Sequence, residues 1–242
     1  MLEREQWESV MLDNFLFVAL PYVTLLLLIG GSFYRAFTGA KTQFRGHINW
    51  SARGDLLWTT RSTGFFGRAS IGPAALSLHW GLLVVIVGHV AGFIGGAFGW
   101  TGWVEYFRWT GLFGGVLLFY GLSWALVRRV VTPQLRAMST FDDIAVLVLL
   151  VAITGLGLYY PIARFTFGVS YAVGPWFAGI FQLRPDAAQI AGAPLIVRLH
   201  MIVAMVFLCY LPFTKLVHAF SFPFGYATRP YISMRSYVGL KR

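Results

Sequence analysis

The chain has 242 residues, of which 57% are hydrophobic and 12% are charged, and its formal net charge is +10. The charged fraction is about half that of soluble domains, so the composition argues against a soluble globular protein and indicates an integral membrane protein. In a soluble chain this positive charge would suggest nucleic-acid binding, but here the basic residues lie between apolar runs, where membrane topology explains them better. The single cysteine, Cys209, excludes a disulfide or a thiolate metal site within the chain.

Five apolar runs approach the roughly 20 residues that a helix needs to cross a bilayer. We expect these spans at about residues 15–34, 72–98, 109–127, 144–160 and 195–220. The polar N-terminus lacks the basic region of a signal peptide, so we expect the first span to be retained. With no internal repeat in the sequence, the fold class that we predict is an all-α integral membrane protein, with residues 1–242 in one five-helix domain.

Basic residues are distributed unequally between the two sides of these spans. Most of the 19 Lys and Arg residues follow the first, third and fifth spans. The positive-inside rule then predicts a cytoplasmic-membrane protein with its N-terminus outside and its C-terminus in the cytoplasm. The connection from Pro161 to Pro194 is long for a helical bundle and rich in Gly, Phe and Trp. We expect it on the outer surface, either as a cover over a ligand or as a plain connector.

Four histidines lie within two of the spans: His79 and His89 in the second, and His200 and His218 in the fifth. A histidine in a bilayer-length segment is costly and marks a candidate functional site. Imidazole is a standard haem ligand, and bundles build cofactor sites from facing helices. The sequence therefore predicts two axial pairs for two b haems. The alternatives are buried structural histidines or zinc, which no nearby carboxylate or thiolate supports. His47, in a basic polar loop, is not counted as a ligand.

The predicted topology makes the second and fifth spans antiparallel, which pairs His89 with His200 on the outer side and His79 with His218 on the inner side. On continuous helices, ten residues rise about 15 Å and eighteen rise about 27 Å. We expect helix tilt or a kink at Pro212 to absorb this mismatch. Eighteen steps also return to one helix face, so His200 and His218 would face the same partner.

Small and basic residues accompany the histidines. The glycines of the second and third spans could admit a flat macrocycle or serve ordinary helix packing; they are Gly81, Gly88, Gly92, Gly114 and Gly115. Arg198, two residues before His200, could bind a haem propionate, because arginine binds carboxylates bidentately. Topology or contact with lipid headgroups explains Arg198 equally well.

Several segments resemble the gamma subunit of respiratory nitrate reductase, a b-type cytochrome. The segment RLHMIVAMVFLCYLPFTKLVHAFSFPFGYATR resembles the last membrane helix of that family, and HWGLLVVIVGHVAGF, with its ten-residue histidine spacing, is similar to its second helix. RRVVTPQLRAMSTFDDI is similar to the loop between its third and fourth helices, and NFLFVALPYV with GSFYR is similar to its first helix. The resemblance covers nearly the whole chain.

The resemblance implies five helices with two b haems, His89 and His200 on the outer iron and His79 and His218 on the inner iron. It implies that quinol is oxidised near the outer haem and that electrons pass to an iron–sulfur subunit and a molybdenum catalytic subunit on the cytoplasmic face. The family has a quinol-site lysine after its second helix, where this chain reads WTGWVEYFRWTG. Arg108 and Glu105 in this segment are candidates for binding the quinone oxygen and taking a proton, or are interfacial anchors.

Three classes of function compete. The first is an electron-transfer subunit of an oxidoreductase, which takes electrons from the quinone pool in the lipid. The complex would be nitrate reductase, or an equivalent complex linked to dissimilatory sulfite reductase or to another molybdenum enzyme. The second is a proton-relay transporter, which would usually carry buried Asp or Glu; none lies inside the five predicted spans. The third is a structural anchor, which would not need four intramembrane histidines. We expect no nucleic-acid partner.

Overall fold

The structure is a computed structural model that describes residues 2–44, 68–169 and 171–217. Every regular element in these residues is a helix, and five helical segments are long and apolar enough to cross a membrane. Their bounds are Trp7–Ala36, Ile71–Ala97, Thr101–Val131, Phe141–Phe167 and Leu195–Phe213. The prediction of five membrane helices is therefore confirmed for the described residues, although several bounds differ.

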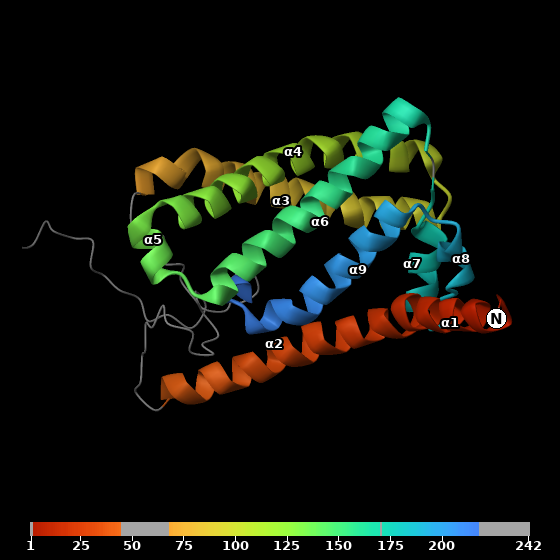
Figure 1. Cartoon of the computed structure of the whole chain (residues 1–242), viewed down its shortest axis with the longest axis horizontal. Coiled ribbons are helices and arrows are strands. Elements are labelled where there is room, and N and C mark those ends of the chain that lie inside the picture. The colour runs from red at the N-terminus through yellow and green to blue at the C-terminus, as the bar shows by residue number, and fades with distance from the viewer. Residues whose placement is uncertain (1, 45–67, 170, 218–242) are drawn as a thin grey trace, which may run out of the picture.

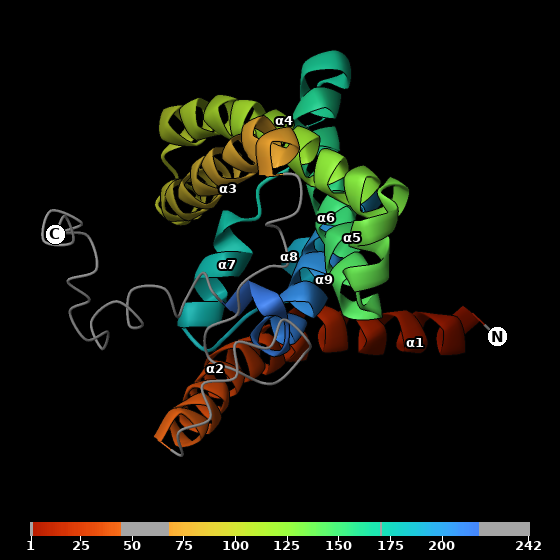
Figure 2. The same cartoon turned by 90° about the vertical axis from the view of Figure 1, so that its left-hand side faces the viewer.

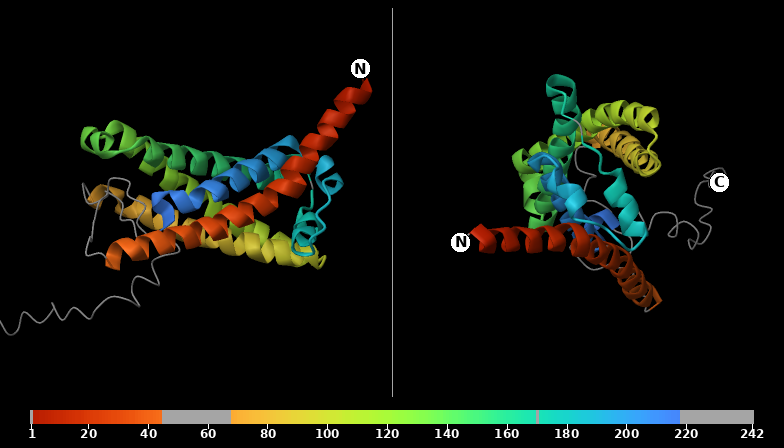
Figure 3. Two further views of the ribbon diagram at one scale, coloured as in Figure 1. Left: turned by 90° about the horizontal axis from the view of Figure 1, so that it is seen from below. Right: turned by 90° about the vertical axis from the view of Figure 1, so that its right-hand side faces the viewer.

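The first span belongs to a longer continuous helix than we predicted. It begins in α1 (Leu2–Asn14), passes through the π-helical η1 (Phe15–Ala19) and continues as α2 (Leu20–Phe44). The polar first residues are helical because Leu, Glu, Arg, Gln and Met all have high helix propensity, and Arg4 lies 3.9 Å from Glu8 one turn later. As a result α1 projects beyond the other helices (Figure 3).

The second and third spans form an antiparallel pair, α3 (Arg68–Ala97) and α4 (Thr101–Val131), which are joined by a tight turn at Gly99 with φ +70°. The prediction that the third span begins at residue 109 is wrong, because α4 starts at Thr101. Polar and charged side chains between residues 101 and 108 lower the hydrophobicity of this stretch without disfavouring a helix. Glu105 and Arg108 therefore lie on the first turns of α4 and not in a loop.

Glycines let α3 and α4 approach closely. A Cβ atom at Gly81 would lie 2.5 Å from the backbone nitrogen of Leu118, and one at Gly114 would lie 2.7 Å from a methyl group of Val84. These two glycines therefore serve helix packing, one of the two roles considered for them. Gly92 differs, because a Cβ there would meet nothing within 4 Å.

A short helix, α5 (Pro133–Met138), leads from α4 into α6 (Phe141–Phe167). Thr140 and Asp143 form a capping box at the start of α6, in which each side chain bonds the backbone N–H of the other residue. This reciprocal cap satisfies two donors at the helix start and sets where the fourth span begins.

The prediction that the fourth span ends at residue 160 is wrong, because α6 continues through Pro161 to Phe167. A proline removes only one backbone donor, and membrane helices tolerate that loss. The helix ends at Gly168, whose φ of +67° is the left-handed conformation that favours glycine. The connection to the last span is therefore residues 168–194 and contains α7 (Gly174–Phe181) and α8 (Ala188–Ala191).

The last span ends earlier than predicted. The α-helix α9 covers Leu195–Tyr210, and single turns of 3₁₀ helix follow in η2 (Leu211–Phe213) and η3 (Lys215–Val217). We predicted a span to about residue 220 with helix tilt or a kink at Pro212; within the described residues the α-helix instead ends at Tyr210, because Pro212 has no N–H and its ring clashes with the preceding turn. The expectation that His200 and His218 share a helix face loses its basis, since it assumed an unbroken helix. His218 lies outside the described residues.

Arg35 of α2 stabilises the break after α9. Its side chain is 3% exposed, and its Nη1 donates to the carbonyl oxygens of Pro212, at 2.6 Å, and Thr214, at 2.5 Å. Carbonyl groups at the end of a helix have no partner within the helix and carry partial negative charge, which a guanidinium satisfies. Just beyond, Lys215 donates to Asp143 of α6 at 2.8 Å. Helices α2 and α6 therefore both bind the chain at the point where α9 ends.

We predict that Arg35→Met lowers stability by roughly 2–4 kcal/mol, because two buried carbonyls lose their charged donor. Thermal unfolding of the detergent-solubilised protein measures the effect. Arg4→Met is the matched control, since the Arg4 side chain is 88% exposed and its loss should leave the midpoint unchanged. Equal midpoints for the two variants would show that Arg35 does not hold this break.

The helices pack in the order α3, α4, α6, α9 and α2, so that α3 and α2 lie at opposite ends of a curved row (Figures 1 and 2). At one end of the bundle, which we term the α7 end, α1, α7, α8 and the α3–α4 turn lie together (Figure 1). The α5 end is opposite. A buried apolar cluster at the α7 end joins α7 and α8 to the first and last spans; it includes Phe17, Trp176, Ile180, Ile190 and Val197.

Candidate functional site

The structure brings together His89 of α3 and His200 of α9. Their ring centroids are 6.1 Å apart and their ring planes differ by 24°. The two helices are not neighbours in the packing order of the bundle, so this ring contact joins α3 directly to α9. This is the pair expected at the outer level of the bundle.

Both rings are oriented by hydrogen bonds to backbone carbonyl groups. The Nδ1 atom of His89 lies 2.8 Å from the carbonyl oxygen of Val85, and that of His200 lies 3.0 Å from the carbonyl oxygen of Ile153. Because a carbonyl oxygen only accepts, Nδ1 must carry the proton, and in the neutral ring the lone pair is then on Nε2. Histidines that bind metals commonly have this arrangement, in which the second nitrogen is fixed by a hydrogen bond.

The separation of the two ring centroids is compatible with one metal ion held between two imidazoles. Two rings that bind a metal from opposite sides, with bonds of about 2.0–2.1 Å, place their centroids roughly 6 Å apart, which matches the separation of His89 and His200. A zinc site fits less well, because the described residues contain no group of three or more His, Cys, Asp or Glu side chains that could hold a metal. A haem needs only two axial ligands from the protein, which is the number of imidazoles that meet here.

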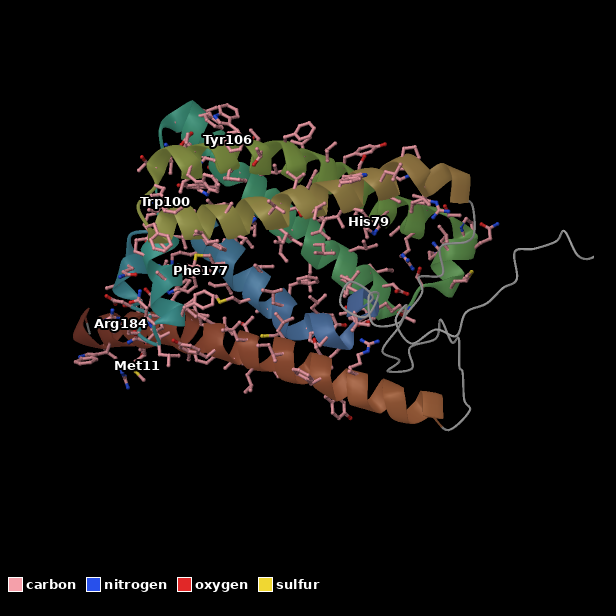
Figure 4. The ribbon with its side chains drawn as sticks, turned by 180° about the vertical axis from the view of Figure 1, so that it is seen from behind. Met11, His79, Trp100, Tyr106, Phe177 and Arg184 are labelled. Carbon is pink, nitrogen blue, oxygen red and sulfur yellow. The ribbon has the colours of Figure 1, made fainter. Side chains whose placement is uncertain are left out.

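His79 has the same local arrangement as His89 on the same helix. Its Nδ1 lies 2.7 Å from the carbonyl oxygen of Ala75, four residues earlier, which again leaves the lone pair on Nε2. Figure 4 shows His79 on α3 on the α5-end side of Trp100 and Phe177. Its expected partner, His218, lies outside the described residues, as does His47. The inner pair therefore stays a prediction.

Sequence reasoning did not single out Gly157 of α6, which contacts the His200 ring. A Cβ atom at Gly157 would lie 2.9 Å from Cε1 and 3.3 Å from Nδ1 of His200. One turn earlier, Ile153 supplies the carbonyl that binds the same ring. A glycine within a membrane helix is too common to signal such a role by itself, because small residues also serve helix packing.

Aromatic rings cover His89 on the α7 side. Phe93 lies 5.8 Å from His89 between centroids, and Phe93 stacks on Phe177 of α7 at 4.0 Å. Gly96 and Gly174 allow this approach, because a Cβ at Gly174 would lie 2.4 Å from the backbone of Gly96. The connection between α6 and α9 thus packs against α3 next to the histidine pair, which is the position expected of a cover.

The acidic and basic candidates form ion pairs at the α7 end. Glu105 accepts from Arg108 and, at 3.0 Å, from Arg164 of α6. Arg198 pairs with Asp13 and lies 5.3 Å from the centroid of the Phe17 ring. With the observed helix bounds, five acidic residues lie inside candidate spans, Glu8, Asp13, Glu105, Asp142 and Asp143, so the expectation that the spans contain no acidic residue is wrong. Glu105 and Asp13 are the two at the α7 end that these ion pairs involve. Both carboxylates are paired with arginine.

An apolar groove opens between α6 and α9 at the α7 end. Its volume is about 410 Å³, within the range of small-molecule sites. Ile196 lines the groove and lies one turn before His200 on α9, so the groove begins about one helical turn from the histidine pair. The other lining residues include Tyr159, Tyr160, Ala163, Phe167 and Leu199.

Residues 13–237 match the family model described as nitrate reductase gamma subunit. The chain is 31% identical over 226 residues to the nitrate reductase gamma chain of Bacillus subtilis, covering 89% of this chain and 95% of that protein. The chain belongs to the nitrate reductase gamma subunit family. The resemblance to this family is thereby confirmed, and the matched range spans the positions of all four histidines.

Two other relatives show the range of proteins that contain gamma-subunit sequences. The respiratory nitrate reductase 1 gamma chain of Escherichia coli is 27% identical over 239 residues, covering 93% of this chain and 98% of that protein. The nitrate reductase-like protein NarX of Mycobacterium tuberculosis is 31% identical over 244 residues, covering 93% of this chain but 34% of that protein. The gamma-subunit sequence is thus similar both to separate chains and to one part of a longer one.

Proposed function

We propose that this chain is the membrane cytochrome b subunit of a respiratory nitrate reductase, which oxidises quinol and passes electrons through two b haems to an iron–sulfur partner subunit. The observation that carries the proposal is the His89–His200 pair, at a centroid separation of 6.1 Å with both Nδ1 atoms bound to carbonyls. Membership of the gamma-subunit family supports it. The terminal chemistry belongs to another chain, which carries the molybdenum site.

A b haem bound between two imidazoles supplies one-electron transfer at a potential that its ligands and their hydrogen bonds tune. His89 and His200 hold the outer iron in this proposal, and their bonds to Val85 and Ile153 fix the ring orientations. His79 and His218 hold the inner iron. Phe93, stacked on Phe177 of α7, contacts the His89 ring on the outer side.

Quinol binds, in this proposal, at the α7 end of the bundle. The groove between α6 and α9 gives an isoprenoid tail an apolar surface, whose lining residue Ile196 lies one helical turn before His200. Arg108 and Glu105 are two of the charged groups at that end, with Arg108 as donor to a quinone oxygen. The family's lysine is missing from residues 100–109, so Arg108 is the basic residue in the matching segment.

We predict that Arg108→Ala slows haem reduction by a quinol analogue about 10- to 100-fold, because a charged hydrogen bond worth about 1.5–3 kcal/mol is lost, while both haems stay bound. Stopped-flow spectroscopy of the purified complex measures the rate. Arg184→Ala is the control, since Arg184 bonds Gln182 two residues away, at 2.8 and 2.9 Å. A rate unchanged from that of the control would make Arg108 an interfacial anchor.

The α5 end is the cytoplasmic side in this proposal, and the α7 end, with the N-terminus, is outside. Arg128, Arg129, Arg136 and Lys215 lie near the α5 end, as the positive-inside rule requires of that side. The iron–sulfur subunit and the molybdenum subunit dock there. Arg198, at the opposite end, is proposed to bind a propionate of the outer haem in addition to its pairing with Asp13.

Two alternative functions can each be distinguished from this proposal by experiment. An equivalent quinol-oxidising subunit of a complex linked to dissimilatory sulfite reductase or another molybdenum enzyme would contain the same haems, and the companion chains that copurify identify the acceptor. A proton-relay transporter would contain no haem. The arginine pairing of Glu105 and Asp13, near the ends of their spans, gives little support to a relay through the membrane interior.

A further inference from the structure

His200 differs from the other two described histidines in what orients its ring. The Nδ1 atoms of His79 and His89 bind carbonyls of their own helix, four residues earlier. The Nδ1 atom of His200, on α9, instead binds the carbonyl of Ile153 on α6, 3.0 Å away. The orientation of this one ring therefore depends on how two helices are placed relative to each other.

The side chain missing at position 157 makes this bond possible. In a helix, residue 157 lies one turn beyond residue 153 on the same face, so its side chain would stand beside the Ile153 carbonyl. With glycine there, the His200 ring occupies that space, and a Cβ atom would come within 2.9 Å of Cε1 and 3.3 Å of Nδ1. The carbonyl has a second lone pair for His200 beyond the one used in the helix.

Neighbouring contacts set the distance of α6 from α4. Leu158, next in sequence to Gly157, packs against Gly115 of α4, where a Cβ atom would lie 2.7 Å from Leu158 Cδ2. Farther along, Trp109 of α4 stacks on Phe165 at 3.9 Å. Because α6 is held on this side, it has little room to move away from a larger group at position 157.

We propose that Gly157 and the Ile153 carbonyl are positioning groups for the outer haem, acting through the His200 ring to set the direction of its Nε2 atom. This inference rests on the proposed function, because it requires a haem at the His89–His200 pair. Helix α6 supplies no axial histidine. In this inference it nevertheless controls the strength of the bond from His200 to the iron and the midpoint potential of the outer haem.

The test is Gly157→Ala in the intact purified complex. An added methyl group should displace the His200 ring and break its bond to Ile153. We expect loss of the low-spin signal of one haem, up to half of the total, or a shift in the midpoint potential of that haem alone. Electron paramagnetic resonance and an optical redox titration measure the two quantities, neither of which depends on turnover.

Gly155→Ala is the matched control. It adds the same methyl group to the same helix two residues away, where a Cβ would lie 3.5 Å from Phe119 Cε2, an ordinary contact. Both haems should keep their wild-type signals in Gly155→Ala. The inference is overturned if Gly157→Ala matches the wild type or if the two variants change equally.

If Gly157→Ala does not accumulate, Leu158→Ala takes its place, because it adds no atom and loosens the packing of α6 on α4. A shift confined to the outer haem then supports the inference, and unchanged or equally shifted haems overturn it. Wild-type protein without any b-type spectrum would instead contradict the proposed function, so the two failures are distinguishable.

Discussion

Replacing His89 or His200 with alanine should remove one and the same haem, and replacing His79 or His218 should remove the other. The expectation for the first pair follows from the 6.1 Å separation of the two rings and from the free Nε2 lone pairs that their hydrogen bonds imply. Loss of one of two strong iron–imidazole bonds leaves a site that releases its haem or becomes high-spin. Each variant should therefore retain about half of the low-spin haem, since one of two sites remains.

Haem stoichiometry and spectra of the four purified variants measure this result. His47→Ala is the control and should keep both haems, because His47 is not a predicted ligand. The pairing would be wrong if His89→Ala and His200→Ala removed different haems, as judged by the midpoint potential and low-spin signal of the haem that remains.

Gly81→Ala should strongly destabilise the bundle. A Cβ atom there would lie 2.5 Å from the backbone nitrogen of Leu118 and 2.7 Å from the backbone oxygen of Gly114. Backbone atoms cannot rotate away as a side chain can, so α3 and α4 must separate along their length. Overpacking typically costs about 1–3 kcal/mol, and we expect the upper part of this range, with a lower thermal midpoint and less haem at both sites.

Two glycines provide controls for this variant. A Cβ atom at Gly72 of α3 or at Gly111 of α4 would meet nothing within 4 Å. Alanine there should raise helix propensity by about 1 kcal/mol and leave the thermal midpoint unchanged or higher. A Gly81→Ala midpoint equal to that of these controls would contradict the close packing of the two helices.

The sequence predicted the five membrane helices because long apolar runs depend on composition, which a sequence shows directly. It predicted the ends of the helices less well. Glu105 and Arg108 suggested a loop, although both lie on α4, and Pro161 suggested an end that α6 passes through. A charged residue or a proline indicates only the local free-energy cost of continuing a helix. Packing and backbone hydrogen bonds decide whether the helix continues.

The candidate site was predicted in part. Antiparallel topology was sufficient to pair His89 with His200, because the depth of a residue in a membrane helix follows from its position in the span. The role of Gly157 was not predictable, since it depends on which helix packs against α9. At Pro212 the sequence predicted a kink and not the end of the α-helix. The hydrogen bond from Arg35 was not predictable, because Arg35 lies 177 residues earlier and only the fold brings it to Pro212.

In the function proposed above, this chain binds two b haems that quinol reduces. The most direct test is an optical redox spectrum of the purified complex, with a quinol analogue as the reductant. The account predicts a b-type spectrum with about two low-spin haems per chain, reduced by quinol before any nitrate is added and reoxidised when nitrate follows. Absence of b-type haem from intact, correctly folded protein, or haem that quinol does not reduce, would contradict it.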